Sequence, residues 1–460
     1  MTSSEANNPE TTLPEAALPE TNNPEAALSE TNMSEGVLSE TNMPEAALLP
    51  ENRPDRVTPG LPPVELQVFG FAAGGDGLAR GDDGKVVFVA GVVPGERVRV
   101  ELTETRRDFA RGEVLQVIEA ARERVDPACP YVASGCGGCD WQHVEPAAQP
   151  GFKVGIVADA LRRLGGIEQV AIVEGPVLSS TGYRTTVRLA GAGGGRGGYR
   201  LARSHELVAV DRCQVAHPLL DELIREADFG AAKEVTLRCG ARTGERMIVA
   251  NPTTEGFQVP EDVTVVGLNE LKAGRRVWIH EEVAGRRWRF SARSFFQDRP
   301  DGAEALVDAV QAGVGVPADV GGGDGRLFDL FGGVGLFAGT VDPGWKVELV
   351  EWSASSVADA RVNLADRNVR IHRLNVTSWR PSPADVVIAD PPRTGLKAPG
   401  VRAIAMTGAV RVVLVSCDPA ALARDAALLQ AEGYGIESVT VIDLFPQTSH
   451  IETVAVFGRG

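Results

Sequence analysis

The chain has 460 residues, a hydrophobic fraction of 43% and a formal net charge of -16 at pH 7. This length accommodates two or three domains, and the hydrophobic fraction is ordinary for a globular protein. No apolar run reaches the ~18 residues of a membrane span, and no basic stretch followed by an apolar core marks a secretory signal. We therefore expect a cytoplasmic protein without a membrane partner, and a monomer.

Residues 1–60 are of low complexity, with glutamate recurring in ten-residue units at Glu10, Glu20, Glu30 and Glu40. Such a segment cannot bury enough apolar surface to offset its ordering entropy, which predicts a disordered, solvated tail. The first 56 residues contribute -9 of the formal charge and leave the remainder near -7. Overall charge therefore gives no support to nucleic-acid binding, and any RNA contact would depend on local basic patches.

Residues 61–120 are expected to form short strands separated by turns. The β-rich runs are Val64–Phe69, Lys85–Val89, Arg97–Leu102 and Phe109–Ile118, and Gly74–Gly77 is a turn signal between the first two. This spacing predicts a small barrel of the oligonucleotide-binding (OB) kind. Its arginines could face phosphates, although ordinary surface positions fit equally well. They are Arg97, Arg99, Arg106, Arg107 and Arg111.

Residues 121–295 are expected to form a central α+β domain that carries a cluster of cysteines. Cys129, Cys136 and Cys139 follow a Cys-x6-Cys-x2-Cys pattern, and Cys213 comes later. A Cys-x2-Cys pair with two further cysteines predicts a four-thiolate site for an iron–sulfur cluster or zinc, and spacing alone does not choose between them. Cys239 is expected to be an inert strand residue.

Residues 296–460 alternate apolar runs of strand length with helical stretches. This alternation predicts βαβ units, a buried parallel sheet and hence an α/β, Rossmann-like domain. The strands are expected at Leu327–Phe331, Lys346–Glu351, Val369–His372, Asp385–Ala389 and Val410–Ser416, with helices at Ser353–Asp366 and Pro419–Glu432.

Two features in this last region predict a nucleoside-cofactor site. Gly333, Gly335 and Ala338 match G-x-G-x-x-A after a strand, and Glu351 at the next strand end is placed to accept from ribose hydroxyls. NAD and S-adenosylmethionine both fit this pattern. The motif Asp390-Pro391-Pro392-Arg393 favours the second, because a rigid acid at a strand end resembles motif IV of base-modifying methyltransferases.

A candidate nucleophile and base lie in the same region. Cys417 follows a strand and precedes a helix, whose N-terminus is expected to favour the thiolate. A thiolate that adds to carbon 6 of uracil places electron density on carbon 5, and a base must later remove the carbon 5 proton. Glu452 is the expected base, His450 is a competitor or a positioning residue, and a polar hairpin is the plainer alternative for both.

Taken together, the motifs resemble those of the RNA 5-methyluridine methyltransferases that carry an N-terminal TRAM domain, from about Val64 to Phe457. They include the cysteine pattern, Ser294-Phe295-Phe296-Gln297, the glycine turn and Ser416-Cys417-Asp418-Pro419. One position departs, since Leu336 stands where many relatives have asparagine. The competing interpretations are a catalytically inactive RNA-binding protein, a methyltransferase that acts on a different base or acceptor, and an NAD-dependent oxidoreductase.

The resemblance implies a class I methyltransferase fold, an rRNA or tRNA substrate, S-adenosylmethionine as cofactor and a [4Fe-4S] cluster on the four cysteines. It also implies that Cys417 is the nucleophile and Glu452 the proton acceptor. The implied contacts to S-adenosylmethionine are Gln297, Phe331, Glu351, Asn375 and Asp390.

Overall fold

A computed structural model describes residues 62–202, 204–318, 320 and 325–460 of the chain. The predicted disordered tail at residues 1–60 lies outside the described residues. None of the described helices is both long and apolar enough to pass through a lipid bilayer.

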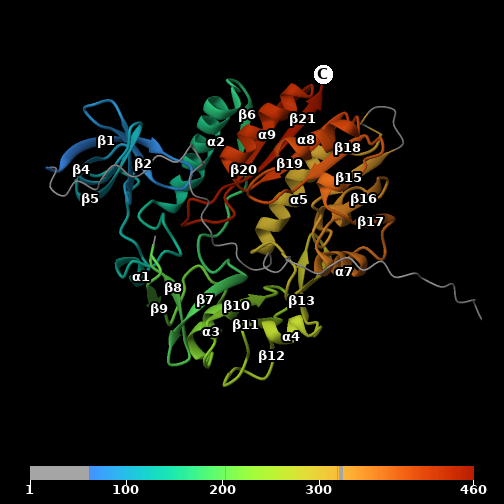
Figure 1. Cartoon of the computed structure of the whole chain (residues 1–460), viewed down its shortest axis with the longest axis horizontal. Coiled ribbons are helices and arrows are strands. Elements are labelled where there is room, and N and C mark those ends of the chain that lie inside the picture. The colour runs from blue at the N-terminus through green and yellow to red at the C-terminus, as the bar shows by residue number, and fades with distance from the viewer. Residues whose placement is uncertain (1–61, 203, 319, 321–324) are drawn as a thin grey trace, which may run out of the picture. The chain divides into compact units, whose positions relative to one another are not determined.

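The first described region is a closed five-stranded barrel with the strand order β1-β2-β3-β5-β4, which confirms the predicted OB-like barrel (Figure 1). Alternate residues of its strands point inward, and Leu66, Val68, Val98 and Val100 fill its core. The sequence did not predict β2, which has only four residues and adjoins the glycine turn. The strands are β1 Val64–Phe71, β2 Gly77–Arg80, β3 Val86–Ala90, β4 Arg97–Thr105 and β5 Phe109–Glu119.

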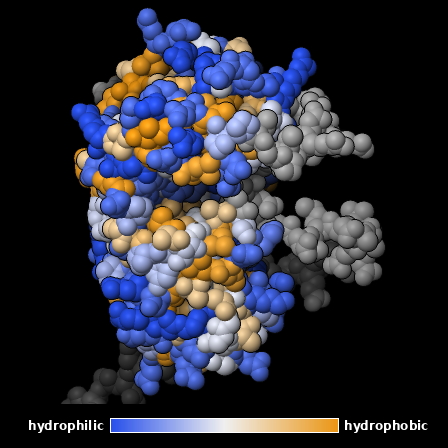
Figure 2. Space-filling view, turned by 90° about the vertical axis from the view of Figure 1, so that its left-hand side faces the viewer, coloured by the Kyte–Doolittle hydropathy of each residue, from blue (hydrophilic) through white to orange (hydrophobic). Residues whose placement is uncertain are grey.

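The barrel arginines that could face phosphates lie beside carboxylates. Arg97 and Arg99 pair with Glu65, and Arg111 pairs with Asp76 at 3.0 Å. Their charge is therefore largely balanced within the barrel. Hydrophilic and hydrophobic residues are interspersed on the face shown in Figure 2.

The central region contains a six-stranded sheet with the order β12-β11-β10-β7-β8-β9 and a separate hairpin, β13–β14. The helix α3 packs on this sheet through Leu220, Leu223 and Ile224. The strands are β7 Thr186–Gly193, β8 Arg196–Arg200, β9 Leu207–Ala209, β10 Glu234–Cys239, β11 Arg246–Asn251, β12 Val263–Gly267, β13 Trp278–Val283 and β14 Arg286–Ser291. The helices are α1 Pro130–Ala133, α3 Pro218–Glu226 and α4 Leu268–Lys272.

The C-terminal region is built on an eight-stranded sheet with the order β17-β16-β15-β18-β19-β21-β20-β6. The first five of these strands are parallel and β21 is antiparallel to β19, which confirms the predicted Rossmann-like arrangement. The strands are β15 Arg326–Leu330, β16 Lys346–Glu351, β17 Val369–Arg373, β18 Val386–Ala389, β19 Arg411–Ser416, β20 Tyr434–Ile442 and β21 Glu452–Arg459. The helices are α5 Pro300–Val314, α6 Leu336–Thr340, α7 Ala354–Asn363, α8 Lys397–Met406 and α9 Pro419–Ala431.

Two elements that precede the six-stranded sheet in the chain are part of the C-terminal region, one as a strand of its sheet and one as a helix packed beside it. The strand β6 (Ala171–Glu174) pairs in parallel with β20, and the helix α2 (Gln149–Gly165) packs beside α9 (Figure 1). Ile156, Val157 and Leu161 of α2 share one buried cluster with residues of α9. The helix α5 contacts strands of the same sheet and shares a second buried cluster with them.

Candidate active site

Glu351, the last residue of β16, forms hydrogen bonds with both the glycine turn after β15 and the start of α7. One carboxylate oxygen of Glu351 accepts from the Gly333 N–H at 3.1 Å, and the other accepts from the Ser353 N–H at 2.6 Å. Burial raises the pKa of Glu351, and these two hydrogen bonds partly offset that rise. Phe331 opens the turn with a φ of 61°, a left-handed conformation that is costly for a residue with a side chain. Strained backbone of this kind is concentrated at functional sites.

Asp390 lies directly after β18, beside β15 in the sheet. Burial and the negative charge of Glu351 raise the pKa of Asp390 to about 7. The two carboxylates thus stand close enough to interact electrostatically at the carboxyl edge of the sheet, as their places after parallel strands predict.

A third carboxylate, Asp329, was not predicted from the sequence. It lies in β15 and is 0% exposed, with one oxygen accepting from the Ala338 N–H at 2.9 Å. The other oxygen is buried without a hydrogen-bond partner in the described part of the chain. Burial raises the pKa of Asp329 to about 7, with Asp390 and Glu351 adding to the effect. The signal that could have revealed it is an acid inside an otherwise apolar strand beside a glycine turn.

Cys417 follows β19 at the same edge of the sheet. Burial and the charges of Glu452 and Asp390 raise the pKa of the Cys417 thiol to about 12. The helix N-terminus was expected to favour the thiolate, and burial together with these carboxylates outweighs that effect on the pKa of Cys417. Asp418, which caps α9 by accepting from the Ala421 N–H at 2.7 Å, adds a smaller negative contribution beside the thiol.

Glu452 and His450 differ sharply in their surroundings. Burial and the charge of Asp390 hold the pKa of Glu452, which is 6% exposed, well above its usual value. Burial and the cations Arg393 and Arg184 lower the pKa of His450 to about 3. His450 is therefore neutral, and its Nδ1 accepts from the Arg393 guanidinium at 2.8 Å. This occupied nitrogen favours Glu452 over His450 as the proton acceptor.

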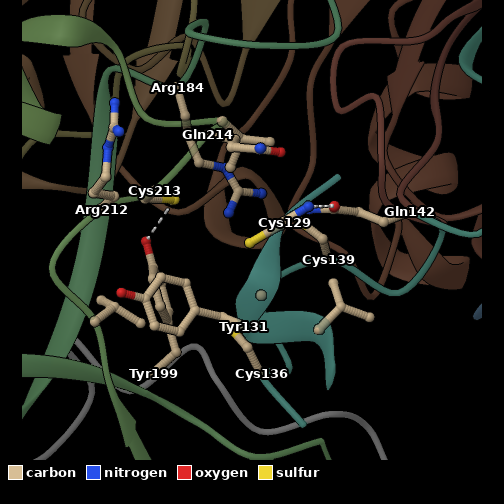
Figure 3. A pocket seen from close by; sticks show the side chains of 14 residues that line it. Cys129, Tyr131, Cys136, Cys139, Gln142, Arg184, Tyr199, Arg212, Cys213 and Gln214 are labelled. Atoms are coloured by element: carbon tan, nitrogen blue, oxygen red, sulfur yellow. Dashed lines mark hydrogen bonds between the residues drawn. The ribbon is translucent and has the colours of Figure 1, made fainter. Parts of the chain in front are cut away.

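All four predicted metal-binding cysteines line one cavity, shown in Figure 3. Cys213 comes to this cavity from the loop after β9 and accepts from the Tyr199 hydroxyl at 3.4 Å. Burial raises the pKa of the Cys139 thiol to about 12. Within the described residues, no three or more His, Cys, Asp or Glu side chains are grouped as ligands of a metal ion. Cys239 lies buried in β10 away from the cavity. The four cysteines that line the cavity are Cys129, Cys136, Cys139 and Cys213.

Comparison with known proteins gives the family. Residues 64–115 match the TRAM domain family, and residues 346–459 match the tRNA (Uracil-5-)-methyltransferase family. A 23S rRNA (uracil(1939)-C(5))-methyltransferase, RlmD, of Alkalilimnicola ehrlichii is 30% identical over 440 residues, which cover 86% of this chain and 97% of that protein. The chain belongs to the RNA (uracil-5-)-methyltransferase family.

Two further proteins resemble this methyltransferase over most of their length. A protein of Streptomyces avermitilis described as an "Uncharacterized RNA methyltransferase" is 35% identical over 427 residues, covering 85% of this chain and 97% of that protein. The crystal structure of a Pyrococcus abyssi tRNA (uracil-54, C5)-methyltransferase in complex with S-adenosyl-L-homocysteine has a TM-score of 0.64. It covers 86% of this chain and 100% of its own at 23% identity, so the likeness concerns the fold.

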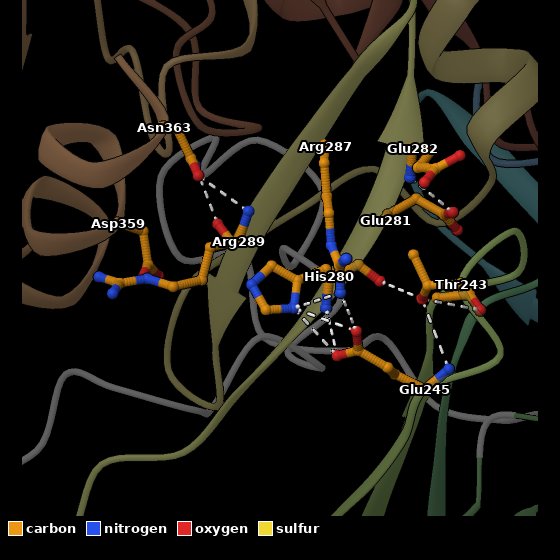
Figure 4. A network of polar contacts seen from close by, with 10 residues as sticks. Thr243, Glu245, His280, Glu281, Glu282, Arg287, Arg289, Asp359 and Asn363 are labelled. Carbon is orange, nitrogen blue, oxygen red and sulfur yellow. Dashed lines mark hydrogen bonds and ion pairs between the residues drawn. The ribbon is translucent and has the colours of Figure 1, made fainter. Parts of the chain in front are cut away.

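Gln297 of the methyltransferase follows a segment that is anchored to α7, as Figure 4 shows in part. The buried Asp359 carboxylate accepts from the Arg289 Nε at 2.7 Å, the Ser291 N–H at 2.7 Å and the Ser294 hydroxyl at 2.6 Å. The helix α7 begins shortly after Glu351. This network therefore attaches the segment that precedes Gln297 to the helix that follows Glu351.

Asn375 follows β17 at the carboxyl edge of the sheet, and its side chain caps its own turn by accepting from the Thr377 N–H at 2.9 Å. Among the hydrogen bonds of the described residues, none joins Gln297 or Asn375 to Glu351 or Asp390. The structure therefore links Glu351, Asp390, Cys417 and Glu452 by electrostatic interactions, and the roles of the uncharged Gln297 and Asn375 stay predictions.

Proposed function

We propose that this chain methylates carbon 5 of a uridine in RNA, with S-adenosylmethionine as the methyl donor. The observation that carries the proposal is the meeting of one thiol with two carboxylates, Cys417 with Asp390 and Glu452, at a single edge of the sheet. A nucleophile and a general base beside a cofactor-binding glycine turn are the groups that this reaction requires. Membership of the family supports a uracil ring in RNA as the acceptor.

The donor would lie over the glycine turn. Glu351 would accept hydrogen bonds from its ribose hydroxyls, since each carboxylate oxygen can accept more than the one backbone N–H it already binds. Phe331 and Asp390 line the same strand ends, and we place Gln297 and Asn375 as further contacts. S-Adenosylmethionine supplies an electrophilic methyl group, and its positive charge would offset the carboxylate charges that raise the pKa of Cys417.

The residues of the chain then perform two steps. The Cys417 thiolate adds to carbon 6 of the uracil, and the electron pair of the former 5,6 double bond makes carbon 5 nucleophilic toward the methyl group. After methylation, Glu452 in its ionised form accepts the proton from carbon 5, and its raised pKa makes that carboxylate a stronger base. The double bond re-forms as the carbon–sulfur bond to Cys417 breaks, which regenerates the thiolate and releases the RNA.

The test is transfer of tritiated methyl from S-adenosylmethionine to unmodified RNA, with the modified nucleoside identified by mass spectrometry. We expect 5-methyluridine, and we expect Cys417→Ala to lose it while retaining donor binding. Cys239→Ala, a change at a buried cysteine away from the site, is the matched control. Transfer that persists in Cys417→Ala would overturn the covalent mechanism.

Ribosomal RNA is the substrate class that we propose to test first. The relative whose description names a 23S rRNA is 30% identical, whereas the tRNA enzyme is similar in fold at 23% identity. We propose that residues 61–120 contact the RNA, that residues 121–295 form the central domain and that residues 296–460, together with α2 and β6, form the catalytic domain. Methylation of transfer RNA alone would assign the other substrate class.

We also propose that the four cysteines hold a [4Fe-4S] cluster, with zinc as the alternative. The support is the chemistry of the donor set, since four thiols from two distant segments line one cavity. Protein purified without oxygen should contain about four iron and four sulfide per chain. Cys136→Ser should lose both. Stoichiometric zinc without iron would decide for the alternative, and neither metal would overturn the proposal.

A further inference from the structure

The segment 445–450, which we call the 445–450 loop, leads into Glu452 and contains His450. In the sequence, this loop and the cysteine pattern are separate features. In the structure they are in direct contact, because the residues that follow Cys139 bind the backbone of the loop. The Ser449 N–H donates to the Asp140 carboxylate at 2.9 Å, and the Trp141 N–H donates to the Gln447 carbonyl at 3.0 Å.

The helix α2 adds to this contact from its first turns. The buried Gln149 side chain accepts from the Gln447 N–H at 2.7 Å and donates to the Val144 carbonyl at 2.9 Å. Lys153 is also buried, and its ammonium donates to the Phe445 carbonyl at 3.2 Å. Gln447 itself has a φ of 68°, so these hydrogen bonds hold the loop in a conformation that is costly for a side-chain-bearing residue.

The second cysteine segment reaches the same loop by another route. The Arg184 N–H donates to the carbonyl of Val215, two residues after Cys213, at 2.8 Å. The Tyr183 hydroxyl donates to the Pro446 carbonyl at 2.8 Å, and the Arg184 guanidinium lies over the Phe445 ring at 5.8 Å from its centre. Both segments that carry the cysteines are therefore attached to the 445–450 loop.

Arg184 also belongs to the cysteine cavity. Figure 3 shows its guanidinium directed into the space among the cysteines, and its buried Nε has no hydrogen-bond partner in the described residues. A buried guanidinium N–H without a hydrogen-bond partner is costly, and thiolates or an anionic group held by them would compensate for it. The Arg184 side chain therefore lines the cysteine cavity and also packs over the Phe445 ring.

The glycine turn of the barrel also contacts the segment after Cys139 and the 445–450 loop. The Trp141 indole N–H donates to the Gly75 carbonyl at 3.2 Å. Gly75 has a φ of 90°, and a Cβ at this position would lie 2.6 Å from the Asp140 carboxylate and 2.7 Å from the Ser449 Cβ. Only glycine fits there, because the turn is packed against both partners of the Asp140–Ser449 hydrogen bond.

We propose that the four-cysteine cavity positions His450 and Glu452 through the 445–450 loop, with Asp140 and Arg184 as the positioning residues. A metal group held by these cysteines would fix Cys139 and Cys213, and their segments would then hold the loop from two sides. The cysteine site thereby controls the catalytic end of the molecule. The role of Glu452 rests on the proposed function, whereas the coupling is a property of the chain that is measurable without RNA.

Hydrogen–deuterium exchange of the full-length protein, purified without oxygen, tests the coupling. Loss of one hydrogen bond of about 1.4 kcal/mol should speed exchange of the affected amides about tenfold. We expect this in peptides that cover residues 445–452 in both Asp140→Ala and Cys136→Ser. Asp140→Asn keeps an oxygen acceptor for Ser449 and should remain near the wild-type rate. Cys239→Ser is the control for loss of a cysteine outside the cavity.

Unchanged exchange of residues 445–452 in Cys136→Ser would overturn the proposal, as would equal exchange in Asp140→Ala and Asp140→Asn. Exchange in peptides from β18 and β19 reports any loosening of the whole fold. If Cys136→Ser folds poorly, the comparison of Asp140→Ala with Asp140→Asn still tests whether Asp140 holds the loop. With an RNA that accepts methyl groups, Asp140→Ala should lower kcat and leave the KM for S-adenosylmethionine within about twofold. Absence of methylation would refute the proposed function and leave the exchange result intact.

Discussion

The buried Asp329 gives the most direct test of the electrostatics of the site. Its pKa of about 7 means that the folded protein holds a proton there under conditions in which the unfolded chain, with a value near 3.8, has lost it. A folded-state pKa above the unfolded value stabilises the protein at low pH, and the stabilisation is lost as the pH rises through 7. Asp329 is fully buried, so solvent does not weaken this effect.

The size of the effect follows from linkage. Between about pH 5.5 and about pH 8, the Asp329 carboxyl should account for a loss of about 2 kcal/mol in the free energy of unfolding. Asp329→Asn cannot ionise and should lack this part of the pH dependence. Its absolute stability also includes the cost of burying an amide N–H group where an oxygen has no partner, about 1–3 kcal/mol. The change in stability with pH, rather than the stability itself, is therefore the quantity to compare.

The assay is urea unfolding of the wild type and Asp329→Asn at several pH values. Asp82→Asn, at an exposed turn of the barrel, is the matched control and should follow the wild type. The reasoning is refuted if the wild type and Asp329→Asn lose stability in parallel over this range, because the buried carboxyl would then ionise without cost.

Three further predictions concern the reaction and the loop. Glu452→Gln should accumulate a covalent protein–RNA adduct on denaturing gels, because the carbon 5 proton is no longer removed; free product without adduct would exclude Glu452 as the base. The single-turnover rate should rise from about pH 6 to about pH 9, since the pKa of Cys417 is raised to about 12 and the thiolate fraction grows with pH; a flat profile would contradict a rate that depends on this thiolate. Gly75→Ala should cost about 2 kcal/mol in thermal unfolding, because its φ of 90° and the close Asp140 carboxylate both oppose a Cβ; an unchanged Tm would show that the turn relaxes freely.

The sequence predicted the parts of the fold that local pattern encodes. The parallel strands β15, β18 and β19 are almost entirely buried and therefore appear as apolar runs, whereas the edge strand β17 is only partly buried. Because parallel strands end at a common edge, the places of Glu351, Asp390 and Cys417 after three of them predicted that they meet. The barrel was likewise predicted from alternating strands and glycine turns.

Other features depend on contacts between residues far apart in the sequence, which a local sequence pattern does not reveal. The pairing of β6 with β20 joins a segment that precedes the six-stranded sheet to one near the C-terminal end of the chain. The state of Cys417 depends on burial, on Glu452 and Asp390, and on Asp418 rather than on the helix end alone. The unpartnered oxygen of Asp329 and the contact of Asp140 with Ser449 arise only when distant segments pack together.

The place of β6 at the edge of the catalytic sheet has a consequence for how the chain folds during synthesis. Ala171–Glu174 leaves the ribosome long before Tyr434–Ile442, the strand with which it pairs. Until then, the apolar face of α2 has no α9 to cover it, and the unpaired strand can attract other chains. A central domain that folds in the meantime would bring the two ends of its own segment near each other and reduce the entropy cost of closing so long a loop. Nascent chains halted before Tyr434 should accordingly bind chaperones, and release of the last strands should end that dependence.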